Sequence, residues 1–138
     1  MINGIHHVAI AVAAIDPLLP LWTGVFGFEL HAIEHVADQQ VRVAVLLKGT
    51  QRIELVEPAS PDSPVSAFLA KRGPGLHHVC LDVQGLPLLL AQLEAAGLKL
   101  IDKTPRLGAE GRAVAFVHPQ GTGGVLIELS EERPSSAP

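Results

Sequence analysis

Four side chains able to bind a metal ion stand at matching places in the two halves of this 138-residue chain. His7 lies in the segment HHVAIAV, and His78 lies in HHVCLDV, 71 positions later. Glu54 lies in IELVE, and Glu128 lies in IELSE. Imidazole nitrogens and carboxylate oxygens together suit a divalent ion such as cobalt, manganese, nickel or zinc. Four such ligands on an octahedral ion would leave two positions for water or a chelating substrate, as an open catalytic site requires.

The alternation of side chains along a strand separates these four residues from the other histidines and carboxylates. Successive side chains of a strand point to opposite faces of the sheet. The bulky residues that follow the histidine pairs should pack beneath a helix, so His7 and His78 are expected on a roomier, open face, the latter beside Cys80. By the same rule Glu54 and Glu128 point away from the core. Each residue alone is more simply a structural histidine or a surface carboxylate, but their shared positions favour a metal site.

The matching positions arise from an internal repeat of about 70 residues. VRVAV at 41–45 is followed by RAVAF at 112–116, and Gly27 recurs as Gly97. Each module is predicted to form a strand, a helix and further strands, which is a βαβββ unit. IELVE and IELSE are 74 positions apart instead of 71, which predicts a longer loop in the second module before Glu128.

The helices and strands of the two modules are predicted from start and stop signals and from periodicity. Asp16 followed by Pro17 begins a helix that Gly27 ends, and the leucine-rich segment from Leu86 forms a helix that Gly97 ends. Strands are expected at about 28–36, 41–47, 51–57, 98–102, 112–117 and 124–130.

These elements predict a single α+β domain over residues 1–138. The first module covers about 4–60 and the second about 75–131, with a connecting helix at about 63–72 and a frayed tail at 132–138. The paired βαβββ modules are expected to form a cupped mixed sheet around the metal site.

Composition excludes several classes of function. Hydrophobic residues make up 48% of the chain and charged residues 17%, which suits a packed core rather than disorder. The net charge of −4, with no basic block and few aromatic residues, argues against nucleic acid as a partner. The longest apolar run, at 8–15, is far shorter than the about 20 residues that a membrane span needs. A single cysteine and no signal peptide predict a cytoplasmic protein.

Three other side chains are predicted to contact a substrate, namely Arg106, His118 and Lys71. Arg106 and Arg112 flank the glycine-containing segment LGAEG, and arginine suits the recognition of carboxylates or phosphates. His6 and His77 are expected to be structural residues on the packed face, and His31 and His35 to be surface residues.

The chain resembles the vicinal oxygen chelate superfamily (glyoxalase/bleomycin resistance/dioxygenase), and within it the methylmalonyl-CoA epimerase family. The similarity runs through residues 6–129. The metal-site pattern alone is not specific, because bacterial glyoxalase I has the same order of ligands. The segments SPDSPVSAFLAKRGPG and HPQGTGGVLIEL resemble the epimerases more specifically.

The resemblance implies an epimerase that interconverts (R)- and (S)-methylmalonyl-CoA, and a homodimer that takes an acyl-CoA substrate. A metal ion would act as a Lewis acid and stabilise an enolate formed by proton removal at the α-carbon. Glu128 would be both ligand and base. Some family members carry a second catalytic glutamate at the position of Val43, with glutamine at the position of Glu54. This chain has neither, so Glu54 is the hypothesis for the second acid/base.

Two alternatives remain open at this point. Glyoxalase I, a lactoylglutathione lyase, would use the same metal ligands on the hemithioacetal of methylglyoxal and glutathione. A non-catalytic binding protein of the same fold would have no need of four metal ligands. A ring-cleaving dioxygenase is disfavoured because its set of three ligands leaves one of these four without a role.

Overall fold

The computed structural model describes residues 1–133, and the chain divides into two compact units. Unit 1 contains Met1–His6 and the residues from His78 onward, and unit 2 contains His7–His77. Both boundaries fall between the two histidines of an HH pair, so the strands β1 (Ile2–Ala11) and β5 (Gly75–Val83) contribute residues to both units. Of the predicted tail at 132–138, residues 134–138 lie outside the described part of the chain.

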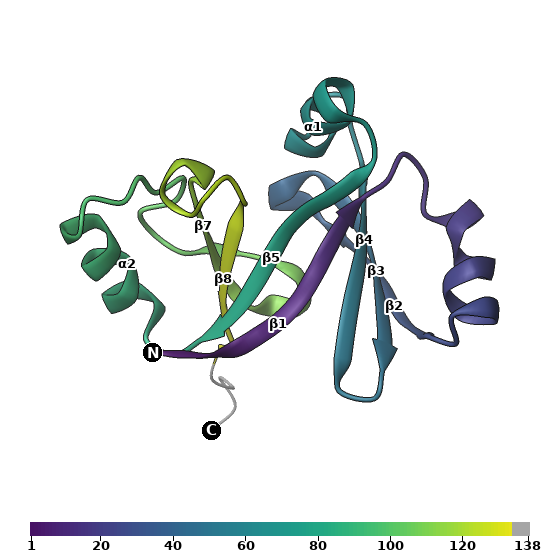
Figure 1. Cartoon of the computed structure of the whole chain (residues 1–138), viewed down its shortest axis with the longest axis horizontal. Coiled ribbons are helices and arrows are strands. Elements are labelled where there is room, and N and C mark those ends of the chain that lie inside the picture. Colours follow the sequence, from purple (N-terminus) through teal and green to yellow (C-terminus); the bar gives the residue numbers. More distant parts are fainter. Residues whose placement is uncertain (134–138) are drawn as a thin grey trace. The chain divides into compact units, whose positions relative to one another are not determined.

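Unit 2 contains the three strands predicted after the first helix. They are β2 (Glu29–Val36), β3 (Val41–Lys48) and β4 (Gln51–Pro58). The strand order is β2-β3-β4-β1, in which β1 runs parallel to β4 and the other neighbours are antiparallel (Figure 1). The predicted strands at 28–36, 41–47 and 51–57 are therefore confirmed.

Unit 1 repeats this topology with β5, β6 (Arg106–Leu107), β7 (Ala113–Val117) and β8 (Ile127–Glu131). The order is β5-β8-β7-β6, and β5 runs parallel to β8 as β1 does to β4. Met1 is bound within this unit, because its amino group donates a hydrogen bond to the Gln84 carbonyl at 2.9 Å. The prediction of an α+β fold built from repeated modules with mixed sheets is confirmed.

The two α-helices begin and end where the sequence signals place them. Helix α1 (Pro64–Arg72) matches the predicted connecting helix: the Ser63 hydroxyl accepts a hydrogen bond from the Val65 N–H at 3.2 Å, and Gly73 follows its last turn. Helix α2 (Leu86–Ala95) is the predicted leucine-rich helix of the second module. None of the helices in the described residues is long and apolar enough to cross a membrane.

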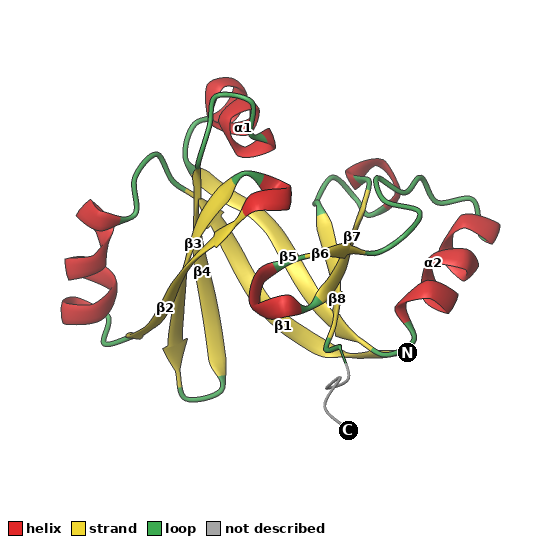
Figure 2. Cartoon of the chain, turned by 180° about the vertical axis from the view of Figure 1, so that it is seen from behind, coloured by secondary structure: helices red, strands yellow, loops and turns green. Residues whose placement is uncertain are grey.

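The helical segment after β1 differs from the single helix predicted there. It consists of a 3₁₀ turn at Asp16–Leu18 followed by a π-helix at Pro20–Val25, in which the Phe26 N–H donates to the Leu21 carbonyl at 2.8 Å (Figure 2). Pro20 is the physical reason. A proline lacks the N–H that an α-helix needs at that position, and its ring disturbs the preceding turn, so the α-helical pattern is broken there.

The predicted strand at 98–102 is wrong. This segment forms only an isolated bridge between Leu100 and Val117. The Asp102 side chain accepts the hydrogen bond from the Phe116 N–H at 2.9 Å, so a side chain occupies the place of the next backbone acceptor. A longer ladder cannot continue past that point, and the short strand β6, which was not predicted, follows it instead.

The strand faces that were expected to pack beneath helices do so in both units. In unit 2 the packed face and the segment after β1 share a core, which contains Val12, Ile15, Ala44, Leu46 and Leu55, with Trp22 packed against it. In unit 1 the equivalent face packs against α2, and the buried residues are Val83, Leu86, Leu90, Ala115, Val117 and Leu129. The opposite faces carry the candidate functional residues.

Candidate metal-binding residues

Unit 2 brings His7 and Glu54 together on one face. Ala9 and Glu54 are partners across the parallel pair β1–β4, and His7 lies two residues earlier on the same face. His7 Nδ1 is 3.2 Å from Glu54 Oε2, and both side chains are 6% exposed. The strand register therefore brings together two of the four residues that the alternation of side chains selects.

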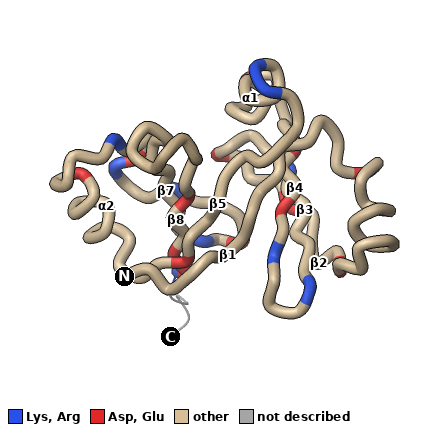
Figure 3. The backbone as a smooth tube through the Cα atoms, viewed as in Figure 1, with Lys and Arg blue, Asp and Glu red and all other residues tan. Residues whose placement is uncertain are grey.

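Unit 1 repeats this arrangement with His78 and Glu128. Cys80 and Glu128 are partners across β5–β8, and His78 lies two residues before Cys80. His78 Nε2 is 3.0 Å from Glu128 Oε1, with side-chain exposures of 6% and 8%. Figure 3 shows acidic residues on β4 and on β8, within strands that are otherwise mostly uncharged. Each unit thus supplies one buried histidine and one buried glutamate from equivalent strands.

The residues around these pairs have little exposed surface, although the small side chains of β1 and β5 predict a roomier face. Ala9 and Cys80 are fully buried. The expectation was based on the small residues of β1 and β5 alone. In unit 2, however, β3 and β4 add Val43, Val45 and Val56 to the same face, and all three are buried.

The geometry within each pair suits a divalent metal ion. Two ligand atoms at right angles on bonds of about 2.1 Å lie about 3.0 Å apart. The distances of 3.2 Å and 3.0 Å in the two pairs are close to this value. A buried carboxylate also needs a compensating charge or hydrogen bonds. The donor atoms of each unit therefore fit a metal ion that takes nitrogen and oxygen ligands.

Arg52 was not predicted as a site residue, although it belongs to this face. It lies two residues before Glu54 on β4, and its Nε donates a hydrogen bond to Glu54 Oε2 at 2.9 Å. The Arg52 side chain is 14% exposed. The signal was present in the segment RIE, because residues at positions i and i+2 of a strand share a face.

In unit 1, Phe116 connects a predicted substrate residue to the His78–Glu128 pair. Phe116 and Glu128 are partners across β7–β8. The rings of Phe116 and His78 meet edge to face, with centroids 5.5 Å apart. The Arg106 guanidinium lies over the same Phe116 ring, with Cζ 5.8 Å from the ring centroid. Arg106 therefore belongs to the neighbourhood of this pair.

The other predicted contact residues have different surroundings. His118 caps a short 3₁₀ turn, because its Nδ1 accepts a hydrogen bond from the Gln120 N–H at 3.0 Å. Lys71 is exposed in the last turn of α1, which is coloured blue in Figure 3. Arg112 is bound within unit 1, since it donates to the Ser130 hydroxyl at 2.6 Å and also to the Asp82 carboxylate.

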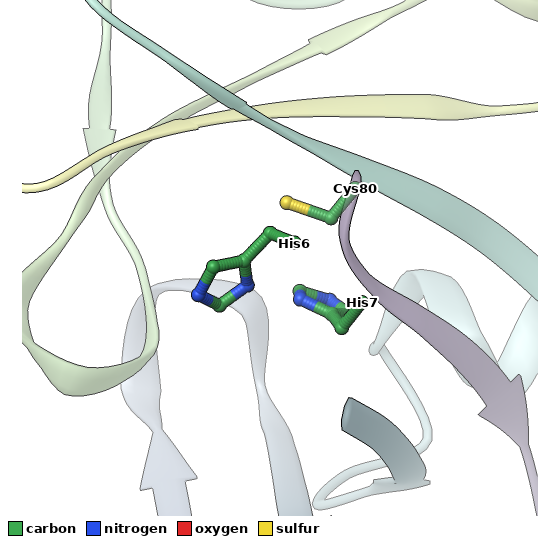
Figure 4. Close-up of side chains that lie close together, drawn as sticks. All are labelled: His6, His7 and Cys80. Atoms are coloured by element: carbon green, nitrogen blue, oxygen red, sulfur yellow. The ribbon is translucent and has the colours of Figure 1, made fainter. Parts of the chain in front are cut away.

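The remaining histidines differ in exposure. His31 and His35 are exposed on β2, as predicted. His77 packs edge to face on Phe68 of α1, with ring centroids 4.9 Å apart. His6 is half-buried, and one of its ring nitrogens lies within 4.8 Å of Cys80 Sγ (Figure 4). Since Cys80 shares a face with Glu128, His6 lies close to that face and not only against the packed one.

Val43, the position at which some family members carry a glutamate, is buried in β3. Its partner across β2–β3 is Glu34, which is half-buried. Directly paired residues of neighbouring strands share a face. A carboxylate is therefore present on this face one strand away from Val43, and sequence reasoning missed it because the register was unknown.

Comparison with known proteins agrees with the fold. The model of the Glyoxalase/Bleomycin resistance protein/Dioxygenase superfamily matches residues 6–116. The chain is 40% identical over 131 residues to the uncharacterized protein YqjC of Bacillus subtilis, covering 95% of this chain and 94% of that protein. It is 37% identical over 133 residues to the mitochondrial methylmalonyl-CoA epimerase of Dictyostelium discoideum, covering 95% and 80%.

A solved structure extends this similarity to three dimensions. A variant of the Streptomyces coelicolor methylmalonyl-CoA epimerase in complex with 2-nitronate-propionyl-CoA superposes with a TM-score of 0.91 at 30% identity, covering 100% of both chains. The chain therefore belongs to the glyoxalase/bleomycin resistance protein/dioxygenase superfamily, and within it to the methylmalonyl-CoA epimerase family of isomerases.

Proposed function

We propose that this protein is a metal-dependent epimerase that interconverts (R)- and (S)-methylmalonyl-CoA. The observation that carries the proposal is the repeated buried His–Glu pair, one in each unit, in a chain of the epimerase family. A glyoxalase I would use similar ligands, but the relatives that carry an assigned activity favour the epimerase.

The proposed metal ligands are His7, Glu54, His78 and Glu128. Their equivalent positions in the sequence repeat and the distances within each pair fit a divalent ion, which would be cobalt, manganese, nickel or zinc. When bound, the ion would act as a Lewis acid that polarises the thioester carbonyl and stabilises the enolate.

The two glutamates are the proposed acid/base groups. Glu128, in its ionised form, would remove the α-proton, and Glu54, in its protonated form, would return a proton to the opposite face of the planar carbon, which inverts the centre. Exchange with water would then remove the proton from Glu128 and restore the one on Glu54. Ligand and base are competing roles for one carboxylate, so Glu128 would have to loosen its hold on the metal during proton transfer. Glu54 is additionally held by Arg52 at 2.9 Å, which keeps its Oε2 in a fixed position.

Arg106, His118 and Lys71 are the proposed contacts for the acyl-CoA substrate. Of these, Arg106 has the strongest support, because it shares Phe116 with the His78–Glu128 pair. His118 can contribute only through Nε2, since Nδ1 accepts a hydrogen bond from the backbone. The resemblance further supports a homodimer, and the single cysteine fits a cytoplasmic location.

Deuterium exchange tests the proposed function. Protein loaded with cobalt is mixed with methylmalonyl-CoA in deuterated water, and label is followed at the α-carbon by mass spectrometry. We expect incorporation well above the uncatalysed rate, and loss of incorporation in Glu128→Gln. Glu132→Gln is the matched control, because Glu132 is exposed on the same segment. Absence of exchange would refute the epimerase, and formation of lactoylglutathione from methylglyoxal and glutathione would support the lyase instead.

A further inference from the structure

We infer that Arg106 binds the free carboxylate of the acyl group, and that Asp102 is a positioning residue that holds its guanidinium for this purpose. The inference rests on the proposed function, because it assigns one part of the proposed substrate to one side chain. All the contacts that support it lie within unit 1.

Asp102 is fixed to β7 by both its side chain and its backbone. Its Oδ2 accepts a hydrogen bond from the Phe116 N–H at 2.9 Å, and its own N–H donates to the Phe116 carbonyl at 3.3 Å. The Asp102 side chain is 11% exposed. The carboxylate therefore has little freedom, and its second oxygen, Oδ1, lies 2.9 Å from Arg106 Nε.

Arg106 is consequently held at three points. Its backbone pairs with Val114 in the β6–β7 ladder, its Nε faces Asp102, and its guanidinium lies over the Phe116 ring. The ion pair at Nε and the ring beneath the guanidinium restrict where its terminal nitrogens can lie. A long side chain that is already ordered loses less conformational entropy when it binds a ligand.

The location of Arg106 relates it to the reacting part of the substrate. Phe116 contacts the Arg106 guanidinium with one part of its ring and the His78 ring with another, and it is the cross-strand partner of Glu128. An anion bound by Arg106 would therefore lie one aromatic ring away from the proposed ligand and base. The side chain is 35% exposed, so a ligand can reach it.

The substrate carries a suitable anion next to its α-carbon. In methylmalonyl-CoA the proton that moves lies between a thioester carbonyl and a carboxylate, and a guanidinium binds carboxylates through two parallel hydrogen bonds or through one of their oxygens. Binding of this carboxylate by Arg106 would orient the α-carbon toward Glu128. It would also select dicarboxylic acyl-CoA esters over monocarboxylic ones.

Two esters that differ only in the carboxylate test the role of Arg106. Calorimetric titration of the cobalt-loaded protein compares methylmalonyl-CoA with propionyl-CoA. We expect Arg106→Gln to weaken binding of methylmalonyl-CoA about 10- to 100-fold, as for the loss of a hydrogen bond to a charged group. Binding of propionyl-CoA should change less than about twofold, within the range of an ordinary surface substitution. Lys103→Gln is the control, because it removes a neighbouring positive charge that is 75% exposed.

Asp102→Asn tests the positioning role. The amide oxygen of the asparagine can still accept the hydrogen bond from the Phe116 N–H, whereas the negative charge beside Arg106 Nε is lost. We expect methylmalonyl-CoA to bind about three- to tenfold more weakly, as for the loss of one charged partner. Propionyl-CoA binding and the unfolding midpoint should stay near those of the unaltered protein. A purely structural role of Asp102 would instead lower the unfolding midpoint and weaken both esters equally.

The inference is overturned if Arg106→Gln weakens both esters equally, which would assign Arg106 to the phosphates of coenzyme A, or if it weakens neither. Failure of the proposed function is a separate result. It appears as absence of deuterium exchange in the unaltered protein, whereas the difference between the two esters is a comparison of binding and is obtained whether or not turnover occurs.

Discussion

Arg52 and Glu54 form an ion pair on one face of β4, with Nε 2.9 Å from Oε2, and the same oxygen lies 3.2 Å from His7 Nδ1. The carboxylate that is proposed to bind a metal ion thus has a cationic partner within its own strand. The buried charge of Glu54 is therefore compensated by Arg52 without a metal ion.

Replacement of Arg52 should therefore destabilise the metal-free protein. In Arg52→Met the buried Glu54 carboxylate loses its partner, and the unfolding free energy in urea should fall by about 2 kcal/mol. The loss should shrink in the background of Glu54→Gln, which has no charge to compensate. Arg72→Met, at the exposed end of α1, is the control. An equal loss in both backgrounds would show that the ion pair is not the cause.

Replacement of Glu54 should affect both metal binding and catalysis. Glu54→Gln keeps the size of the side chain but removes its charge, so affinity for cobalt should fall about tenfold or more. Deuterium exchange at the α-carbon should fall with it. If metal content and exchange both stay unchanged, Glu54 is neither a metal ligand nor an acid/base group. Glu34, the cross-strand partner of Val43, would then be the next carboxylate on this face to test by substitution.

Metal binding should stabilise the folded protein. A ligand that binds only the native state adds about 2.7 kcal/mol at a free concentration one hundred times its Kd. Differential scanning fluorimetry with and without cobalt should therefore show a higher Tm in its presence. His7→Ala and His78→Ala should each abolish the increase, whereas His31→Ala, at an exposed position, should retain it. A full increase in either of the first two variants would contradict the proposed ligand set.

Glu57, which ends the segment IELVE, and Glu131, which ends IELSE, should each stabilise the start of a helical segment. At the start of α2, Glu131 accepts hydrogen bonds from the Gly85 and Leu86 N–H groups at 2.5 Å and 3.2 Å. In the other unit, Glu57 accepts one from the Ile15 N–H at 2.8 Å. Glu131→Ala should lower the unfolding free energy by about 1 kcal/mol, as the loss of a helix cap does. Glu131→Gln, which keeps an acceptor, should lose less. Equal losses would show that the hydrogen bonds contribute nothing beyond the charge.

Gly108 should tolerate no side chain. A Cβ at this position would lie 2.6 Å from Val114 Cγ1, closer than such atoms approach. Gly108→Ala should therefore displace the segment that follows Arg106 and weaken binding of methylmalonyl-CoA, and it should lower the unfolding free energy by about 1–3 kcal/mol, as overpacking does. Val114→Ala in the same chain should restore part of both losses because it removes the clashing methyl groups. No recovery in the double variant would contradict this explanation.

Much of the fold follows from local patterns in the sequence. The repeat, the period-2 alternation in the strands and the glycines after each helix predict the modules, because each is a property of neighbouring residues. Deviations occur where a single side chain changes the backbone. Pro20 converts an expected helix into a 3₁₀ turn and a π-helix, and Asp102 replaces a backbone acceptor and ends an expected strand.

By itself, the sequence determined which four residues are the candidate metal ligands. Alternation and repeat position select His7, Glu54, His78 and Glu128, and the register within each unit brings each histidine to its glutamate.

Only the tertiary structure decided what surrounds these pairs. The face that carries His7 also includes buried residues of β3 and β4, which are distant from His7 in the chain. The contact between Phe116 and His78, and the hold of Asp102 on Arg106, depend on which strands are neighbours and in which register. The physical reason is that side-chain alternation is local, whereas burial and partners depend on strand pairing between residues far apart in sequence.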